Sequence, residues 1–175
     1  MPVLTEWSAF YTAIGSSAAA LTGLMFVVIT LVAGENRGRD PLGVATFSTP
    51  TVMHFCATLF LSLAILAPWH SLGGVAILLG LMGLYGTIYI VRVMYLTTRL
   101  DRELYVPDAE DWTWFGVLPL LGYGTVVAAA FALPHVPVNA LFAIAGAAVL
   151  LIFVGIRNSW DVVTYLAVDR DSGDE

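Results

Sequence analysis

The sequence contains no lysine and little charge of either sign. Only 11% of its 175 residues are charged, 59% are hydrophobic, and all seven basic residues are arginine. Soluble globular domains have about 25% charged and about 45–50% apolar residues. The shortage of charge therefore excludes an ordinary soluble domain. The net charge of −6 excludes a nucleic-acid partner, because binding phosphates requires a basic surface.

Cysteine and the common catalytic motifs are also scarce or missing. The one cysteine, Cys56, has no partner for an intrachain disulfide or a zinc motif, and we interpret it as a small apolar filler. The sequence contains no G-x-S-x-G and no H-E-x-x-H motif. The carboxylates avoid the apolar runs, which argues against the ion relay of an active transporter. We therefore predict no catalytic residue, no metal site and no cofactor, and disfavour an enzyme.

Long apolar runs dominate the rest of the chain. Each is close to the roughly 20 residues that a helix needs to cross a bilayer. The runs cover residues 9–33, 50–68, 73–97, 113–133 and 137–157. Backbone polar groups in hydrocarbon must be satisfied within their own segment, so each run is predicted to be helical. The fold class is therefore all-α, a polytopic bundle of five transmembrane helices in one domain, 1–168, with an acidic, disordered tail at 169–175.

The arginines indicate the orientation of this bundle. All seven lie in or beside the connections 34–49 and 98–112 or the C-terminal segment, whereas the connections 70–73 and 133–137 carry no charge. The positive-inside rule places the arginine-bearing segments in the cytoplasm. We therefore predict a protein of the cytoplasmic membrane with its N-terminus outside and its C-terminus inside.

Three prolines mark features of the predicted helices. Pro50 and Pro137 are predicted at helix starts, where a missing N–H costs nothing. Pro119 lies well inside the fourth run and predicts a kink there.

Small residues recur at helical spacing in three of the runs. Helices in a bilayer associate by close backbone approach at small residues, because lipid tails are as apolar as leucine. The repeats predict packing between helices of one chain or between protomers, and we expect a homo-oligomer. They comprise Gly15, Ala19 and Gly23 in the first run, Gly80, Gly83 and Gly86 in the third, and Ala140, Ala143 and Ala147 in the fifth.

Two runs carry rows of polar residues on one helical face. Polar groups at membrane depth usually face the bundle interior or a water-filled cavity, which makes both rows candidates for a polar pathway. Each also has a structural interpretation: Arg92 lies near the end of its run and can snorkel to the headgroups, and His54 can be an ordinary hydrogen-bonded histidine. The rows are Thr51, His54, Thr58 and Ser62 in the second run, and Tyr85, Tyr89 and Arg92 in the third.

The string IRNSWD at 156–161 is the most distinctive local feature. Arg157 and Asp161 are four residues apart on one helical face, within reach of an ion pair, and Asn158 lies beside them. We predict a cluster at the cytoplasmic end of the fifth helix, near Arg92 and His54. It acts either as a structural pairing or as a gate or ligand site.

Three functions fit these features. The first is a channel-like or transport-related homo-oligomer, in which one of the polar rows would line a path shared between protomers. The second is an accessory or scaffold subunit that binds a larger membrane protein through its cytoplasmic cluster. The third, least favoured, is a membrane enzyme or cofactor-binding protein. The expected surroundings in every case are the lipid bilayer and, in the second, a membrane protein partner.

Overall fold

A computed structural model describes residues 2–35, 41–99 and 108–171, with side chains described over 2–30, 50–99 and 108–161. Within these ranges every element is helical and no strand is present, which confirms the all-α prediction. The elements are α1 Pro2–Thr5, α2 Ser8–Glu35, α3 Pro41–Leu66, α4 Leu72–Thr97, α5 Ala109–Trp112, the π-helical turn η1 Thr113–Val117, α6 Leu118–Ala132 and α7 Pro137–Asp171.

Four segments in the described part of the chain are long and apolar enough to cross a membrane. They are Ser8–Thr30, Leu72–Thr97, Ala109–Ala132 and Pro137–Asp161. A shorter apolar segment, Pro50–Leu66, belongs to α3. The structure therefore supports a membrane protein with at least four such helices. The count of five spans and the orientation stay predictions.

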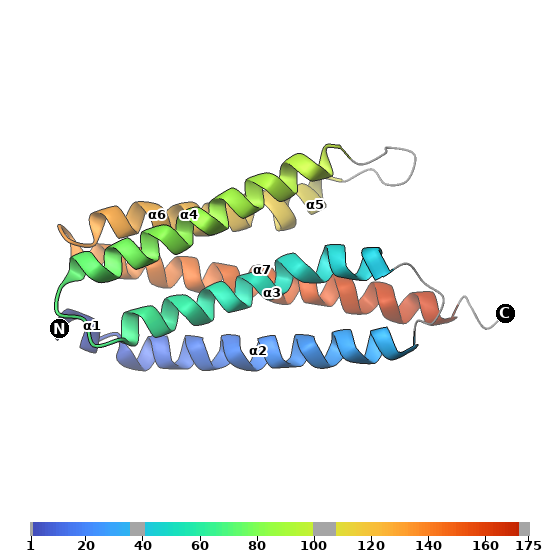
Figure 1. Cartoon of the computed structure of the whole chain (residues 1–175), viewed down its shortest axis with the longest axis horizontal. Helices are drawn as coiled ribbons and strands as arrows, with labels where there is room; N and C mark the ends of the chain where they lie inside the picture. The colour runs from blue at the N-terminus through green and yellow to red at the C-terminus, as the bar shows by residue number, and fades with distance from the viewer. Residues whose placement is uncertain (1, 36–40, 100–107, 172–175) are drawn as a thin grey trace.

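The helices pack in an order that differs from their order in the chain. α2 packs on α3, α3 on α7, α7 on α6, and α6 on α4, while α3 and α4 touch little although they are consecutive. α7 thus joins the α2–α3 pair to the α4–α6 pair (Figure 1). It is also the most buried of the four long apolar helices, and α2 is the least buried.

The two ends of the bundle differ. The turn from α3 to α4 and the turn from α6 to α7 lie at the same end as the N-terminus, whereas α2, α4 and α7 all point toward the opposite end (Figure 1). We call that opposite end, which carries the arginine-rich connections, the inner end, in keeping with the predicted orientation. The other end is called the outer end.

Pro137 begins α7, as predicted, but the prediction for Pro50 is wrong. α3 begins at Pro41, so that Pro50 lies inside the helix. Membrane helices tolerate an internal proline, since neighbouring groups can satisfy the freed carbonyl. Pro119 is the second residue of α6, two residues after the end of the π-helical turn, where the backbone N–H of Leu118 bonds the Thr113 carbonyl five residues back.

Helix boundaries differ from the predicted runs at the inner end. α7 continues to Asp171, beyond the predicted span end at 157 and into the segment predicted as a disordered tail. The rest of that tail, 172–175, lies outside the described residues. α3 likewise begins within the predicted connection 34–49, because nothing in residues 41–49 breaks a helix after its starting proline.

Candidate functional site

The polar side chains of α3 lie together in the bundle interior. Thr51, His54 and Thr58 are fully buried and Ser62 is only 1% exposed. At about 100° per residue these four positions span an arc of about 80°, so they share one helix face. We call them the interior row. Because one chain covers the row completely, it does not line a space shared between protomers.

His54 is hydrogen-bonded to a residue that the sequence analysis did not single out. Its Nδ1 lies 3.0 Å from the hydroxyl of Tyr123, which comes from α6 and is also buried. The Thr58 hydroxyl donates to the His54 carbonyl, one turn away, at 3.0 Å. The second ring nitrogen of His54, Nε2, is buried and has no hydrogen-bond partner among the described residues.

A glycine on α4 makes room for the Tyr123 ring. A Cβ atom on Gly86 would overlap the ring, and one on Gly83 would lie 2.9 Å from the Val127 side chain. Gly80 faces Ala130 at an ordinary contact distance of 3.6 Å. All three predicted packing glycines of the third run therefore face α6 of the same chain.

The small residues of the first run divide between two faces. A Cβ on Gly15 would lie 2.9 Å from that of Ser62, so Gly15 packs α2 against the interior row. A Cβ atom added to Gly23 would have no other atom within 4 Å, and Ala19 is exposed. Of the two glycines, Gly15 is the one whose Cβ position touches another helix.

The polar row of the third run does not enter the interior. Tyr85 is 60% exposed and Arg92 is exposed on the outward face of α4. Tyr89 is half-buried and packs against the cluster that contains Tyr123. Of these three residues only Tyr89 approaches the interior row.

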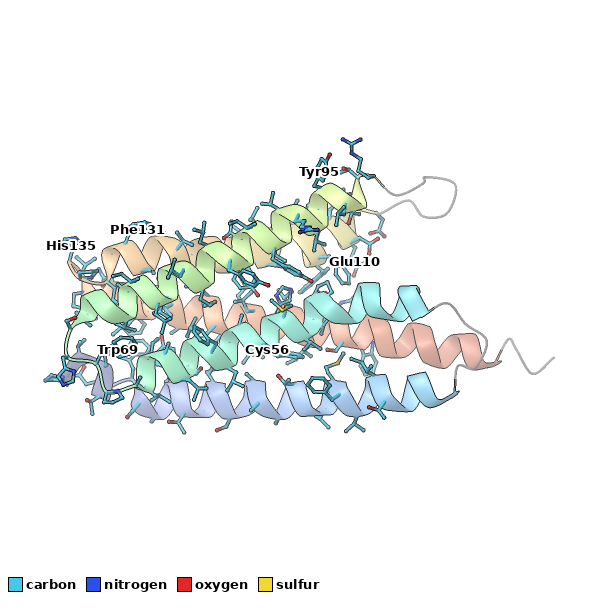
Figure 2. The ribbon with its side chains drawn as sticks, viewed as in Figure 1. Cys56, Trp69, Tyr95, Glu110, Phe131 and His135 are labelled. Atoms are coloured by element: carbon cyan, nitrogen blue, oxygen red, sulfur yellow. The ribbon has the colours of Figure 1, made fainter. Side chains whose placement is uncertain are left out.

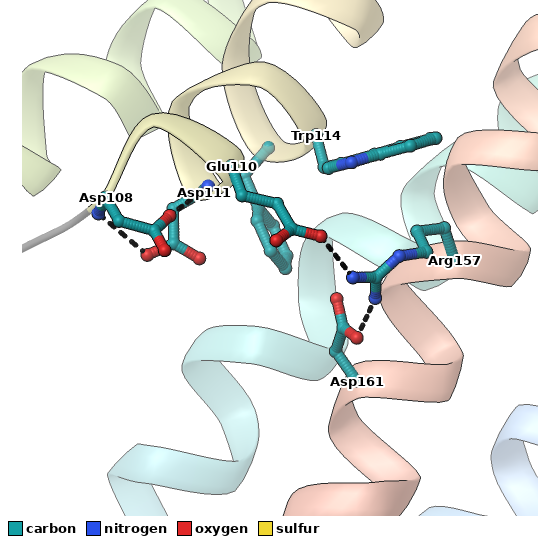
Figure 3. Close-up of a pocket in the computed structure, with 7 residues that line it drawn as sticks. Asp108, Glu110, Asp111, Trp114, Arg157 and Asp161 are labelled. Carbon is teal, nitrogen blue, oxygen red and sulfur yellow. Dashed lines mark hydrogen bonds and ion pairs between the residues drawn. The ribbon is translucent and has the colours of Figure 1, made fainter.

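Arg157 and Asp161, which were predicted to pair, lie beside two residues from the segment that precedes α6. Arg157 pairs with Asp161 on its own helix and with Glu110 of α5, and its guanidinium carbon lies 5.8 Å from the Trp114 ring centroid (Figure 3). Glu110 and Trp114 were not predicted, since no local pattern links them to a helix 47 residues away. We call Glu110, Trp114, Arg157 and Asp161 the inner-end cluster.

This cluster borders a cavity of about 210 Å³. Asp108 and Asp111 begin α5 with a reciprocal capping box, which orients Glu110 toward α7. Four carboxylates and one guanidinium leave the cavity with an excess of negative charge. Its lining residues are Asp108, Glu110, Asp111, Trp114, Phe115, Arg157 and Asp161 (Figure 3).

Asn158 connects the inner-end cluster to the bundle interior. It is fully buried, its Nδ2 donates a long hydrogen bond of 3.5 Å to the Trp114 carbonyl, and its Oδ1 has no partner among the described residues. Gly155, three residues earlier on α7, packs against Phe55. Because α3 and α7 are antiparallel (Figure 1), this register sets Asn158 near the Thr51 end of the interior row.

Three buried polar atoms, two on the interior row and one on α7, lack hydrogen-bond partners among the described residues. They are Ser62 Oγ, His54 Nε2 and Asn158 Oδ1. Buried polar atoms without a protein partner are the usual contacts of internal water. The described residues contain no group of three or more His, Cys, Asp or Glu side chains suited to a metal ion. The described residues of this arrangement are therefore suited to holding internal water.

Comparisons with protein-family models, with curated proteins and with solved structures found no match to this chain. Its function is accordingly argued from the geometry of the site.

Proposed function

We propose that this chain is a transport-related membrane protein that passes protons along the interior row. The observation that carries the proposal is the series of buried, unpartnered polar atoms on α3 and α7, centred on His54. Histidine is the side chain whose proton binding changes near neutral pH, and chains that contain histidine form proton relays in membranes.

A proton route does not require an open pore. One chain of about five spans encloses too little space for hydrated ions, whereas a proton needs only a file of hydrogen-bonding groups and water. The interior row runs from Thr51 to Ser62, about 16 Å along the helix axis at 1.5 Å per residue, and Asn158 continues it toward the inner end. The proposed route therefore works within a single chain.

The route is closed on its outer side in this structure. Beyond Ser62, toward the outer end, α3 continues with Ala64 and Ile65, which are buried in the apolar core. Apolar constrictions in membrane proteins open by transient wetting. We therefore expect slow, passive proton flux in liposomes, driven by the membrane potential.

His54→Gln tests the proposal, because glutamine can still hydrogen-bond Tyr123 but cannot take up a proton. Purified protein in liposomes that contain a pH-sensitive dye should show proton uptake, and the His54→Gln variant should fall to the level of protein-free liposomes. Tyr11→Phe is the matched control. Tyr11 is buried and donates a 3.2 Å hydrogen bond to the Leu141 carbonyl, away from the interior row. Equal flux in wild type and His54→Gln would refute the route.

A second candidate function, a scaffold or self-associating subunit, is favoured by the outward face of α2. α2 is the least buried of the four long apolar helices, and Ala19 and Gly23 on it face away from the rest of the chain. Gly23→Leu should lower the subunit count seen by native mass spectrometry if this face binds a second copy. Gly146→Leu, at an equally open glycine on α7, should leave that count unchanged.

A further inference from the structure

The π-helical turn Thr113–Val117 is explained by the proline that follows it. In an α-helix the Trp114 carbonyl accepts from residue 118 and the Phe115 carbonyl from residue 119. Residue 119 is proline and has no N–H, so α-helical spacing leaves the Phe115 carbonyl without a donor. In the structure Leu118 instead donates to Thr113, five residues back, and the Trp114 carbonyl then needs the missing N–H of Pro119. Either spacing leaves one carbonyl without a backbone donor.

Asn158 decides between the two spacings. Its buried Nδ2 supplies a donor to the Trp114 carbonyl, the group that π-helical spacing frees. In the bonding of these carbonyls the two spacings therefore differ mainly by the hydrogen bond from Asn158, and a difference of this size favours population of both. π-Helical turns recur at functional sites of other helices for this kind of reason.

The turn also controls the surroundings of the inner-end cluster. Trp114 lies in the turn and under the Arg157 guanidinium, and Glu110, one turn earlier, pairs with Arg157. A change of spacing by one residue rotates everything N-terminal to it about the helix axis by about 100°. It would therefore pull Glu110 and Trp114 away from Arg157 while freeing Asn158.

We propose that Asn158, Pro119 and the π-helical turn form a two-state latch at the inner end of the interior row. With π-helical spacing the latch is closed, and Asn158 is held by the Trp114 carbonyl. With α-helical spacing it is open, and the side chain of Asn158 is free to bind water between the interior row and the charged cavity. As a gate the latch rests on the proposed proton route; as a structural switch it does not.

One labelling scheme observes the Trp114 carbonyl alone. The sequence contains a single Trp-Phe pair, Trp114-Phe115, so protein labelled with carbonyl-¹³C tryptophan and ¹⁵N phenylalanine gives one carbonyl-to-amide cross-peak in solution NMR. The carbonyl chemical shift moves downfield when a short backbone hydrogen bond replaces the long one from Asn158. The peak position in detergent micelles therefore reports the state of the latch without any measurement of flux.

Asn158→Ala is the decisive variant, because it removes the side-chain donor that the Trp114 carbonyl has with π-helical spacing. If the turn then adopts α-helical spacing, the Leu118 N–H bonds this carbonyl and the peak moves downfield, which is the result we expect. Asn139→Ala, at an exposed position near the start of the same helix, should leave the peak in place. A peak of Asn158→Ala that stays in place or moves upfield would mean that the turn keeps π-helical spacing, and would overturn the latch.

Flux measurements separate the latch from the route. Opening the latch should raise proton flux in Pro119→Ala liposomes about fivefold, the change in population that one ordinary intramolecular hydrogen bond produces. A moved peak with no flux in any variant supports the latch and overturns the route. A His54-dependent flux with no downfield movement of the peak in Asn158→Ala supports the route and overturns the latch.

Discussion

Gly86 and Tyr123 act together to build the centre of the site. The Tyr123 ring extends from α6 toward α3 and occupies the space that a side chain at position 86 would fill, and its hydroxyl lies 3.0 Å from His54 Nδ1. Figure 2 shows the side chains along these helices, with Cys56 of α3 labelled. The hydrogen bond and the helix contact therefore depend on one missing methyl group.

Gly86→Ala should destabilise the protein, because its Cβ overlaps the Tyr123 ring and forces that ring or the helix to move. Overpacking of this kind costs about 1–3 kcal/mol. Gly80→Ala on the same helix meets only Ala130 at 3.6 Å, and the higher helix propensity of alanine should leave stability equal or slightly raised. Unfolding of both variants by titration with SDS in mild detergent measures the difference. Equal losses would contradict this account of Gly86.

The His54–Tyr123 hydrogen bond should be measurable as a coupling energy. Hydrogen bonds between membrane helices average about 0.6 kcal/mol and reach about 1.7 kcal/mol. A double-mutant cycle of His54→Ala and Tyr123→Phe should give a coupling toward the upper end of that range. Both side chains are buried, and the Tyr123 hydroxyl is the hydrogen-bond partner of His54 Nδ1. The same cycle with Tyr11→Phe in place of Tyr123→Phe should give none. A zero coupling for the first pair would show that the bond is not formed.

Among the secondary-structure elements, the short α5 is joined to the long α7 by an ion pair. The capping box of α5 starts the helix, and Glu110 then pairs with Arg157, which also pairs with Asp161. These side chains are 33–60% exposed, so solvent screens the interaction strongly. The ion pair between α5 and α7 is therefore weak and sensitive to ionic strength.

Glu110→Gln should lower the free energy of unfolding by less than about 1 kcal/mol at low ionic strength, as for other solvent-exposed ion pairs. The loss should disappear near 1 M salt, where the screening length is about 3 Å. Glu6→Gln, at an exposed carboxylate on the outer end, should show no such salt dependence. The SDS titration above, repeated at several salt concentrations, tests this. A loss that persists at high salt would mean that Glu110 acts through packing rather than charge.

For the whole molecule, the unequal ends of the bundle predict its topology. The N-terminus and the turn before α4 lie at one end, and the far ends of α2, α4 and α7 at the other (Figure 1). An odd number of crossings follows if all five long helical segments span the bilayer. The arginines in the connections then predict which end of the bundle faces the cytoplasm.

The single cysteine makes this topology testable in intact cells. In a Cys56→Ala background, a membrane-impermeant maleimide should label Thr5→Cys and Ser71→Cys, both at exposed positions of the outer end. It should not label Thr98→Cys or Glu175→Cys until the cells are opened. Labelling of both Thr5→Cys and Glu175→Cys from outside would require an even number of spans and would contradict the five-span prediction.

Composition and periodicity by themselves determined that this chain is helical and membrane-like, and that Thr51, His54, Thr58 and Ser62 share one helix face. Both results follow from local physics. Apolar runs of this length must satisfy their own backbone groups, and helical spacing decides which side chains are neighbours on a surface. The same spacing placed Arg157 and Asp161 on one helix face.

Tertiary structure alone decided which faces point inward and what they meet. The row of α3 is buried, whereas Tyr85 and Arg92 of α4 face outward, although both rows have the same spacing. In a soluble helix the apolar side marks the interior, but lipid is as apolar as a protein core, so hydrophobicity does not distinguish inside from outside here. Tyr123, Glu110 and the Trp114 carbonyl became partners of His54, Arg157 and Asn158 only through contacts between distant segments, which no local pattern specifies.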